Sequence, residues 1–153
     1  MSDKLLIRGV RPSDFTEWKP LWDAYNAFYG RTGDTALADE TTAMTWSRFF
    51  DPYEPMHALV AERSGRLLGL AHLIFHRSTI SPGSVCYLQD LFTSASARSE
   101  GIGRALIEEI YRYAEQGGCN RVYWQTHETN ATAMKLYDKV AEKSGFVVYR
   151  KIM

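Results

Sequence analysis

The sequence has few of the features that mark secreted, membrane or nucleic-acid-binding proteins. It contains 2 cysteines in 153 residues, Cys86 and Cys119, and they form no C-x-x-C pair, so neither a disulfide framework nor a cysteine zinc site is indicated. No apolar run approaches the ~20 residues that span a bilayer, and the longest, residues 67–75, is interrupted by Gly69 and His72. The 18 basic and 18 acidic residues balance, which gives no reason to expect nucleic acid or a membrane surface as partner.

Metal-ligand spacing and an apolar leader are also missing from the sequence. His72 and His76 lie four residues apart on an expected strand, about 13 Å at ~3.3 Å per residue, which is too far to bind one metal ion directly. We therefore expect no metal, and buried or edge positions for both histidines. Residues 1–4 lead straight into a strand-like stretch without the apolar region of a signal peptide, so we expect a cytoplasmic protein.

What the sequence does contain is typical of one globular domain over residues 1–153. Hydrophobic residues make up 45% of the chain, enough for a core that still leaves room for a cleft. Periodicity and turn residues predict an α+β fold with helices packed on a mostly antiparallel sheet. We expect strands at 5–10, 57–62, 67–76, 85–93, 121–126 and 146–152, and helices from about residue 14 and at 41–50, 101–116 and 130–143.

A glycine turn, Arg98-Ser99-Glu100-Gly101-Ile102-Gly103-Arg104, follows an expected strand and opens the clearest helix. Glycines let the backbone approach a ligand closely, and a helix N-terminus offers free N–H groups and partial positive charge, so this arrangement suits a phosphate. An ordinary strand-to-helix turn would also need these glycines. A Walker loop is excluded because Arg104 follows Gly103, and a dinucleotide fingerprint lacks its third glycine at Leu106.

In its context this turn resembles the acetyl-CoA motif of the GNAT family of N-acetyltransferases, [Q/R]-x-x-G-x-[G/A], at residues 98–103. The family's second signature, an Asn ahead of a Tyr on one helix, is matched by Asn130 and Tyr137. The stretch Tyr87-Leu88-Gln89-Asp90-Leu91-Phe92 resembles diamine and polyamine acetyltransferases. Residues 121–146 resemble the branch that acetylates polyamines, histones or D-amino acids. The resemblance implies a GNAT fold with six to seven strands, about four helices, and splayed central strands that form the acetyl-CoA cleft.

The resemblance implies acetyl-CoA as co-substrate and assigns residues to it. The backbone of Leu91, Phe92 and Thr93 would bind the pantetheine arm, and Asn130 would reach it. The pyrophosphate would be held by Arg98, Ser99, Glu100, Gly101, Ile102, Gly103 and Arg104. Ser99 departs from the pattern, because many members have glycine there.

The resemblance also assigns the chemistry, which is acetyl transfer to an amine. Tyr137 would protonate the departing CoA thiolate; a buried tyrosine with a structural hydroxyl is the alternative. Gln89 stands where diamine enzymes carry a glutamate, and an amide cannot act as a base, so it would orient the amine or a water. Asp90 is then the nearest carboxylate, with a structural role as its alternative. Glu128 is a second option, and a water chain a third.

The acceptor would be a small primary amine, a polyamine or other alkyl amine first and an amino acid next. Tyr29 and Trp46 are candidates for its pocket, although Trp18, Trp22, Tyr25 and Tyr29 recur at helical spacing and also fit a core stripe. The alternatives are acetylation of a protein lysine or N-terminus, and a non-catalytic acyl-CoA sensor. By family habit we expect a homodimer that pairs through the C-terminal strand, residues 146–152.

Overall fold

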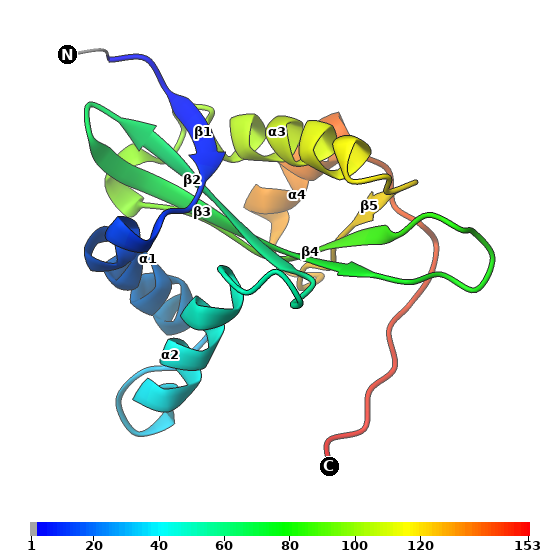
Figure 1. Cartoon of the computed structure of the whole chain (residues 1–153), viewed down its shortest axis with the longest axis horizontal. Coiled ribbons are helices and arrows are strands. Elements are labelled where there is room, and N and C mark those ends of the chain that lie inside the picture. The colour runs from blue at the N-terminus through cyan, green and yellow to red at the C-terminus, as the bar shows by residue number, and fades with distance from the viewer. Residues whose placement is uncertain (1–2) are drawn as a thin grey trace.

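The computed structural model describes residues 3–153 and contains a twisted five-stranded sheet with helices on both faces (Figure 1). The strands follow one another across the sheet as β1 (Leu6–Gly9), β2 (Met56–Arg63), β3 (Arg66–His76), β4 (Val85–Thr93) and β5 (Val122–Tyr123). The helices are α1 (Phe15–Phe28), α2 (Asp39–Arg48), α3 (Ile102–Gln116) and α4 (Ala131–Val140). Strands β1 to β4 are antiparallel neighbours and β5 joins β4 in parallel, so the expected α+β class with a mostly antiparallel sheet and four helices is confirmed.

The sheet is buried on both faces because apolar side chains stand at successive positions of its central strands. Leu59 and Ala61 of β2 point to the face covered by α3, and Val60 between them points to the face covered by α1. This alternation follows from the two-residue period of a strand. The α3 face is closed by Leu106 and other aliphatic residues of that helix, whereas Trp18 and other aromatic residues of α1 close the opposite face.

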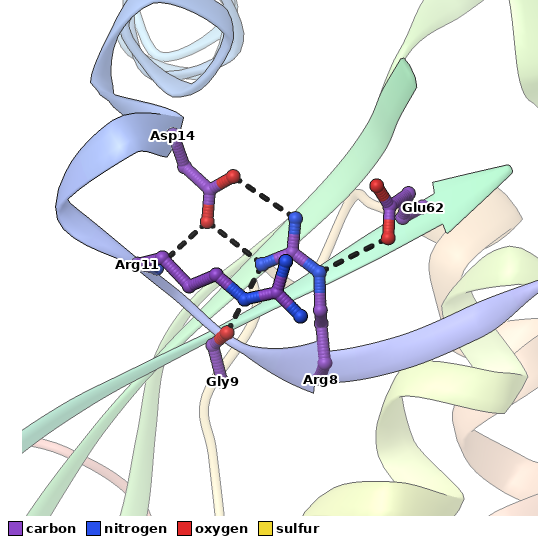
Figure 2. Close-up of polar contacts among 5 residues, drawn as sticks. All are labelled: Arg8, Gly9, Arg11, Asp14 and Glu62. Atoms are coloured by element: carbon purple, nitrogen blue, oxygen red, sulfur yellow. Dashed lines mark hydrogen bonds and ion pairs between the residues drawn. The ribbon is translucent and has the colours of Figure 1, made fainter. Parts of the chain in front are cut away.

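The start of α1 is fixed to the sheet by one arginine (Figure 2). The Arg8 guanidinium on β1 donates from both terminal nitrogens to the Asp14 carboxylate, at 2.8 and 2.9 Å, and from Nε to Glu62 at 3.1 Å. Asp14 also accepts the Arg11 backbone N–H at 2.7 Å, so its side chain closes the short 3-10 turn before α1 instead of capping the helix. The cluster therefore sets where α1 begins, and α1 carries most of the aromatic face.

The parallel pairing of β4 with β5 is short, and the two strands separate after it. Only Cys86 with Val122 and Tyr87 with Tyr123 are paired, and in residues 3–153 no backbone hydrogen bond joins residues 88–93 of β4 to residues 124–130. The last part of β4 thus keeps an unpartnered side that faces away from β3. The family resemblance anticipates such a separation of the central strands.

The sheet has fewer strands than the six to seven expected, and the C-terminal part of the chain accounts for the difference. The strand expected at residues 121–126 is reduced to Val122–Tyr123, because Trp124 turns to pack against Tyr137 with ring centroids 5.4 Å apart. Helix α4 ends at Val140 rather than at residue 143, since Ala141 is extended. Residues 146–152 form no strand, and this part of the chain (red in Figure 1) runs away from β5. Because β5 has only two residues, its edge offers few backbone groups with which another strand could pair.

No α-helix within residues 3–153 is long and apolar enough to cross a bilayer.

We predict that Asp14→Asn lowers the free energy of unfolding by about 1–2 kcal/mol at neutral pH, because a largely buried charge-assisted pair is lost. The Arg8 guanidinium holds the pKa of Asp14 below its ordinary value. The pair therefore stabilises the fold above about pH 4 and loses this contribution as the pH falls through the lowered pKa. Urea unfolding of both proteins across the acid range measures the difference.

Asp23→Asn is the matched control, because Asp23 pairs with Lys19 at 2.7 Å on the exposed side of α1. Its expected cost is about 0.3–0.5 kcal/mol. Equal costs for the two variants, or an Asp14→Asn difference that persists at the acid end of the range, would contradict the role given to Asp14.

Candidate active site

A bulge in β4 gives its neighbouring polar residues Gln89 and Asp90 different surroundings. His72 of β3 pairs with Asp90 and Leu73 pairs with Leu88, so Gln89 is the extra residue. Such a bulge leaves one residue unpaired and turns its neighbours relative to the regular strand. Gln89 is exposed, whereas Asp90 is 8% exposed and points to the α1 face. Of the two residues, only Asp90 therefore faces the interior.

Asp90 is held by a buried chain of hydrogen bonds that sequence reasoning missed. The Nδ1 atom of His72 lies 2.8 Å from Asp90 Oδ2, and the indole N–H of Trp18 donates to His72 Nε2 at 3.1 Å. An indole is only a donor, so His72 Nε2 is unprotonated and its proton sits on Nδ1, from which it is donated to the carboxylate. His72 was expected as an ordinary buried histidine, and the one signal for its role is its register opposite Asp90.

An aromatic wall leads from Asp90 to the C-terminal end of α1. The Tyr25 hydroxyl interacts with the Asp90 carboxylate, and burial followed by that negative charge raises the pKa of Tyr25. The Tyr25 ring lies 5.0 Å from the Tyr29 ring and 6.0 Å from the Phe92 ring, measured between centroids. Tyr25 is 7% exposed and Tyr29 is 46% exposed, so the wall runs from the interior to the surface. The aromatic residues of α1 thus belong in part to the core and in part to this wall.

Tyr137 approaches the same region from α4. Its ring packs edge-on against Trp124, and burial raises its pKa, with a smaller contribution from the neighbouring Tyr29 hydroxyl. A phenol with a raised pKa stays protonated at neutral pH and can donate a hydrogen bond to an anion. The structure therefore brings a half-buried donor on α4 near the exposed end of the aromatic wall.

The glycine turn has the backbone that an anion site requires. Ser99 and Gly101 are left-handed, with φ of 68° and 80°. The first helical hydrogen bond of α3 runs from the Ala105 N–H to the Gly101 carbonyl, so the N–H groups of residues 102–104 have no partner within the helix. The Glu100 carboxylate accepts a hydrogen bond from Arg63 at 2.6 Å, so its negative charge is paired and does not stand free beside the turn. The turn thus presents N–H donors at a helix N-terminus.

Part of the expected cofactor set, Thr93, Arg98 and Gly103, lies together at the end of β4. A Cβ built on Gly103 would lie 3.3 Å from Leu136 of α4 and 4.0 Å from the Thr93 hydroxyl, so α3, α4 and β4 converge there. Arg98 donates to the Thr93 carbonyl at 3.3 Å and lies over the Phe92 ring at 5.5 Å. The side chains of Leu91 and Ile102 are apolar and pack in the core on the α3 side of the sheet. Neither therefore offers a polar group to this junction.

Four of the expected site residues lie apart from this convergence or make other contacts. Trp46 of α2 is partly buried and packs on Trp18, with centroids 4.6 Å apart, against the core of the α1 face. Glu128 lies in an exposed turn, and no contact in residues 3–153 joins it to Asp90. Asn130 immediately precedes α4 and donates from Nδ2 to Thr126 at 3.1 Å. Arg104 pairs with Glu108 on the outside of α3.

Metal ligands do not gather in this region. Across residues 3–153, no group of three or more His, Cys, Asp or Glu side chains is placed to hold a metal ion.

Comparison with known proteins places the chain among acetyltransferases. The sequence model of the acetyltransferase (GNAT) family matches residues 18–141. The chain is 33% identical to the D-amino-acid N-acetyltransferase HPA3 of Saccharomyces cerevisiae, over 99% of this chain and 92% of that protein. The integron cassette protein VCH_CASS6 of V. cholerae is similar in structure, with a TM-score of 0.80 and 25% identity over 100% of this chain and 94% of that one. AAC(6')-Iy, solved with the bisubstrate analogue CoA-S-monomethyl-acetylneamine, shares the fold with a TM-score of 0.82 and 16% identity, over 98% and 99%.

We predict that His72 carries its proton on Nδ1 near neutral pH, because Trp18 donates to the other nitrogen. Long-range proton–nitrogen NMR correlations of the labelled protein distinguish the two tautomers. In Trp18→Phe, which removes the indole donor, the Nε2 signal should move away from its hydrogen-bonded position. An Nε2-protonated ring in the unaltered protein would contradict the chain from Trp18 to Asp90.

Proposed function

The chain belongs to the GNAT family and is an N-acetyltransferase, and on that premise we propose that it acetylates the primary amine of a small molecule. The expected acceptors are polyamines, other alkyl amines and amino acids. One observation carries the proposal: a buried carboxylate, Asp90, lies at the inner end of an aromatic wall whose outer end is near Tyr137. A carboxylate beside aromatic faces suits an ammonium, which both can attract.

The residues around the end of β4 fit acetyl-CoA, the acetyl donor of this family. The left-handed turn and the free N–H groups of α3 suit the pyrophosphate. Arg98 adds positive charge beside them, and Arg104 could do so only by leaving its ion pair with Glu108. The unpartnered side of residues 91–93 offers backbone groups to the pantetheine amides, as a missing strand would. Asn130 and Tyr137 close the other side. One N–H of the β4 end is expected to stabilise the negative charge that develops on the acetyl oxygen.

Proton movement divides between the two sides of the site. An alkyl ammonium has an ordinary pKa near 10, so it must lose a proton before its nitrogen attacks the thioester carbon. We assign that proton to Asp90, directly or through a water, because His72 and Tyr25 orient the carboxylate. As the new C–N bond forms and the C–S bond breaks, Tyr137 gives its proton to the departing sulfur. The second nitrogen proton passes through solvent to the Tyr137 phenolate. Asp90 releases the proton that it took to solvent, so that both residues return to their starting states.

A CoA-release assay with acetyl-CoA and a panel of amines tests the function. The panel contains polyamines, D- and L-amino acids, an aminoglycoside and a lysine peptide. Turnover of a small amine supports the proposal. Turnover of the peptide alone would replace it with protein acetylation, and CoA binding without any turnover would replace it with a sensor.

We predict that Tyr137→Phe lowers kcat about 10-fold or more and changes the affinity for acetyl-CoA little, because only the proton donor is lost. Tyr53→Phe is the matched control, since the Tyr53 ring is 96% exposed in a loop. Steady-state kinetics and calorimetric binding separate the two effects. An unchanged kcat would remove Tyr137 from the role of acid.

We predict that Asp90→Asn lowers kcat/KM for the amine by at least ~10-fold while the fold is kept, because the amide oxygen can still accept from His72 but carries no charge. Thermal unfolding of the variant checks the fold. A lower melting temperature with unchanged kinetics would leave Asp90 a structural residue.

We also propose that the protein is a homodimer that uses its C-terminal segment. In residues 141–153 no residue belongs to a helix or strand, and Phe146, Val148 and Tyr149 are 87%, 71% and 92% exposed. Apolar side chains at successive extended positions suit a strand covered on both faces, and the outer edge of β5 has no neighbour in the described sheet. The C-terminal segment of a second copy, extended in the same way, would supply the missing strand neighbour.

We predict that Val148→Asp converts the dimer to a monomer in light scattering coupled to size exclusion, because a buried strand position rejects an unpaired charge. Ile80→Asp is the matched control, since Ile80 is 92% exposed in the loop between β3 and β4. A monomeric unaltered protein, or a Val148→Asp protein that stays dimeric, would contradict this use of the C-terminal segment.

A further inference from the structure

Arg31 lies just after α1, and its guanidinium is fixed beside the aromatic wall. Its Nε donates to Asn26 Oδ1 at 2.7 Å, and its backbone N–H donates to the Asn26 carbonyl at 2.9 Å. Asn26 is itself 4% exposed and donates to the Trp22 carbonyl at 2.9 Å. The guanidinium carbon lies 5.5 Å from the Tyr29 ring centroid and 6.0 Å from that of Tyr25. A long, flexible side chain is therefore held in one place by a buried anchor and two rings.

The outer end of this guanidinium is available to a ligand. Nε is taken by Asn26, but in residues 3–153 no group accepts a hydrogen bond from either terminal nitrogen of Arg31. Arg63 and Arg66, by contrast, each form an ion pair with a glutamate. A planar fork with open N–H groups matches the two oxygens of a carboxylate. Arg31 is thus a preorganised carboxylate receptor without an internal carboxylate.

Tyr25 connects this cation with the carboxylate of the site. Its ring is flanked by the Arg31 guanidinium, and its hydroxyl interacts with Asp90, so opposite charges stand on two sides of one side chain. The same two charges act on the Tyr25 hydroxyl in opposite directions, Asp90 raising and Arg31 lowering its pKa. A molecule lying along the aromatic wall would therefore meet a negative group at the buried end and a positive group toward the surface.

We propose that Arg31 binds a carboxylate of the acceptor, so that the enzyme acts on amino acids rather than on polyamines. This inference rests on the proposed function, because it concerns the amine that the site acetylates. The acceptor's ammonium lies toward Asp90 and its carboxylate toward Arg31. A polyamine has no anionic group for Arg31 and brings a further ammonium near it, which like-charge repulsion disfavours.

The test compares phenylalanine with phenylalaninamide, each as both enantiomers, and spermidine. The acid and its amide share the reacting amine and differ in the group that Arg31 would bind. The ratio of their kcat/KM values is measured for the unaltered protein and for three variants: Arg31→Gln, Arg31→Lys and Arg77→Gln. Because every protein is tested with the same pair, the difference in amine basicity between acid and amide cancels when the ratios are compared.

We expect the unaltered enzyme to favour the acid, and Arg31→Gln to lower the acid-to-amide ratio about 10- to 100-fold, mainly through KM. Arg31→Lys should restore part of the ratio, because it keeps the charge but not the fork. Arg77→Gln, which removes an equal charge from an exposed position on another loop, should keep the ratio. The KM for acetyl-CoA and the melting temperature of each variant report whether the fold is intact.

Two results would overturn the inference and leave the proposed function standing. One is acetylation of the amide or of spermidine as efficient as that of the acid. The other is an acid-to-amide ratio that Arg31→Gln leaves unchanged. Turnover of no small amine in the wider panel would instead overturn the proposed function, and this inference with it.

Discussion

The hydrogen bond between His72 and Asp90 is the contact on which the site depends. It crosses from β3 to β4 at the bulge, and it continues through the Trp18 indole to α1. A buried carboxylate without such donors would be costly, and a buried indole or imidazole without a partner would be costly too. One chain of donors satisfies all three groups. It also fixes how α1 lies on the sheet, and with it the aromatic wall that runs from Tyr25 to Tyr29.

The two faces of the sheet consequently have different roles. On the α3 face, aliphatic packing brings the glycine turn and α4 to the end of β4, where backbone donors are left unpaired. On the α1 face, the aromatic rings of α1 pack on the aliphatic side chains of the sheet. No backbone ladder joins β4 to β5 beyond Tyr87. The separation of the two strands therefore leaves the faces of the sheet connected at this point. We infer that the acetyl donor uses the first face, the amine uses the second, and transfer takes place between them.

The sequence predicted best what depends on local pattern. The hairpin of β2 and β3, the limits of β4 and the helix after the glycine turn follow from periodicity and turn residues, and all were confirmed. The role of His72 could not be read in this way, because it depends on a register shift that places it opposite Asp90. The prediction of a strand at 146–152 was wrong for the single chain, because an apolar segment forms a strand only where a sheet edge can pair with it. Arg31 lay outside every motif.

The most direct test is a crystal structure of the protein with CoA and an amine. The expected result has the pyrophosphate on the N-terminal turn of α3, the pantetheine along residues 91–93, and the sulfur between the Tyr137 hydroxyl and the amine. The amine nitrogen should lie within hydrogen-bond reach of Asp90, directly or through one water. A sulfur atom remote from Tyr137, or an Asp90 carboxylate still enclosed by His72 and Tyr25 and out of reach of the amine, would contradict the division of the site between the two faces.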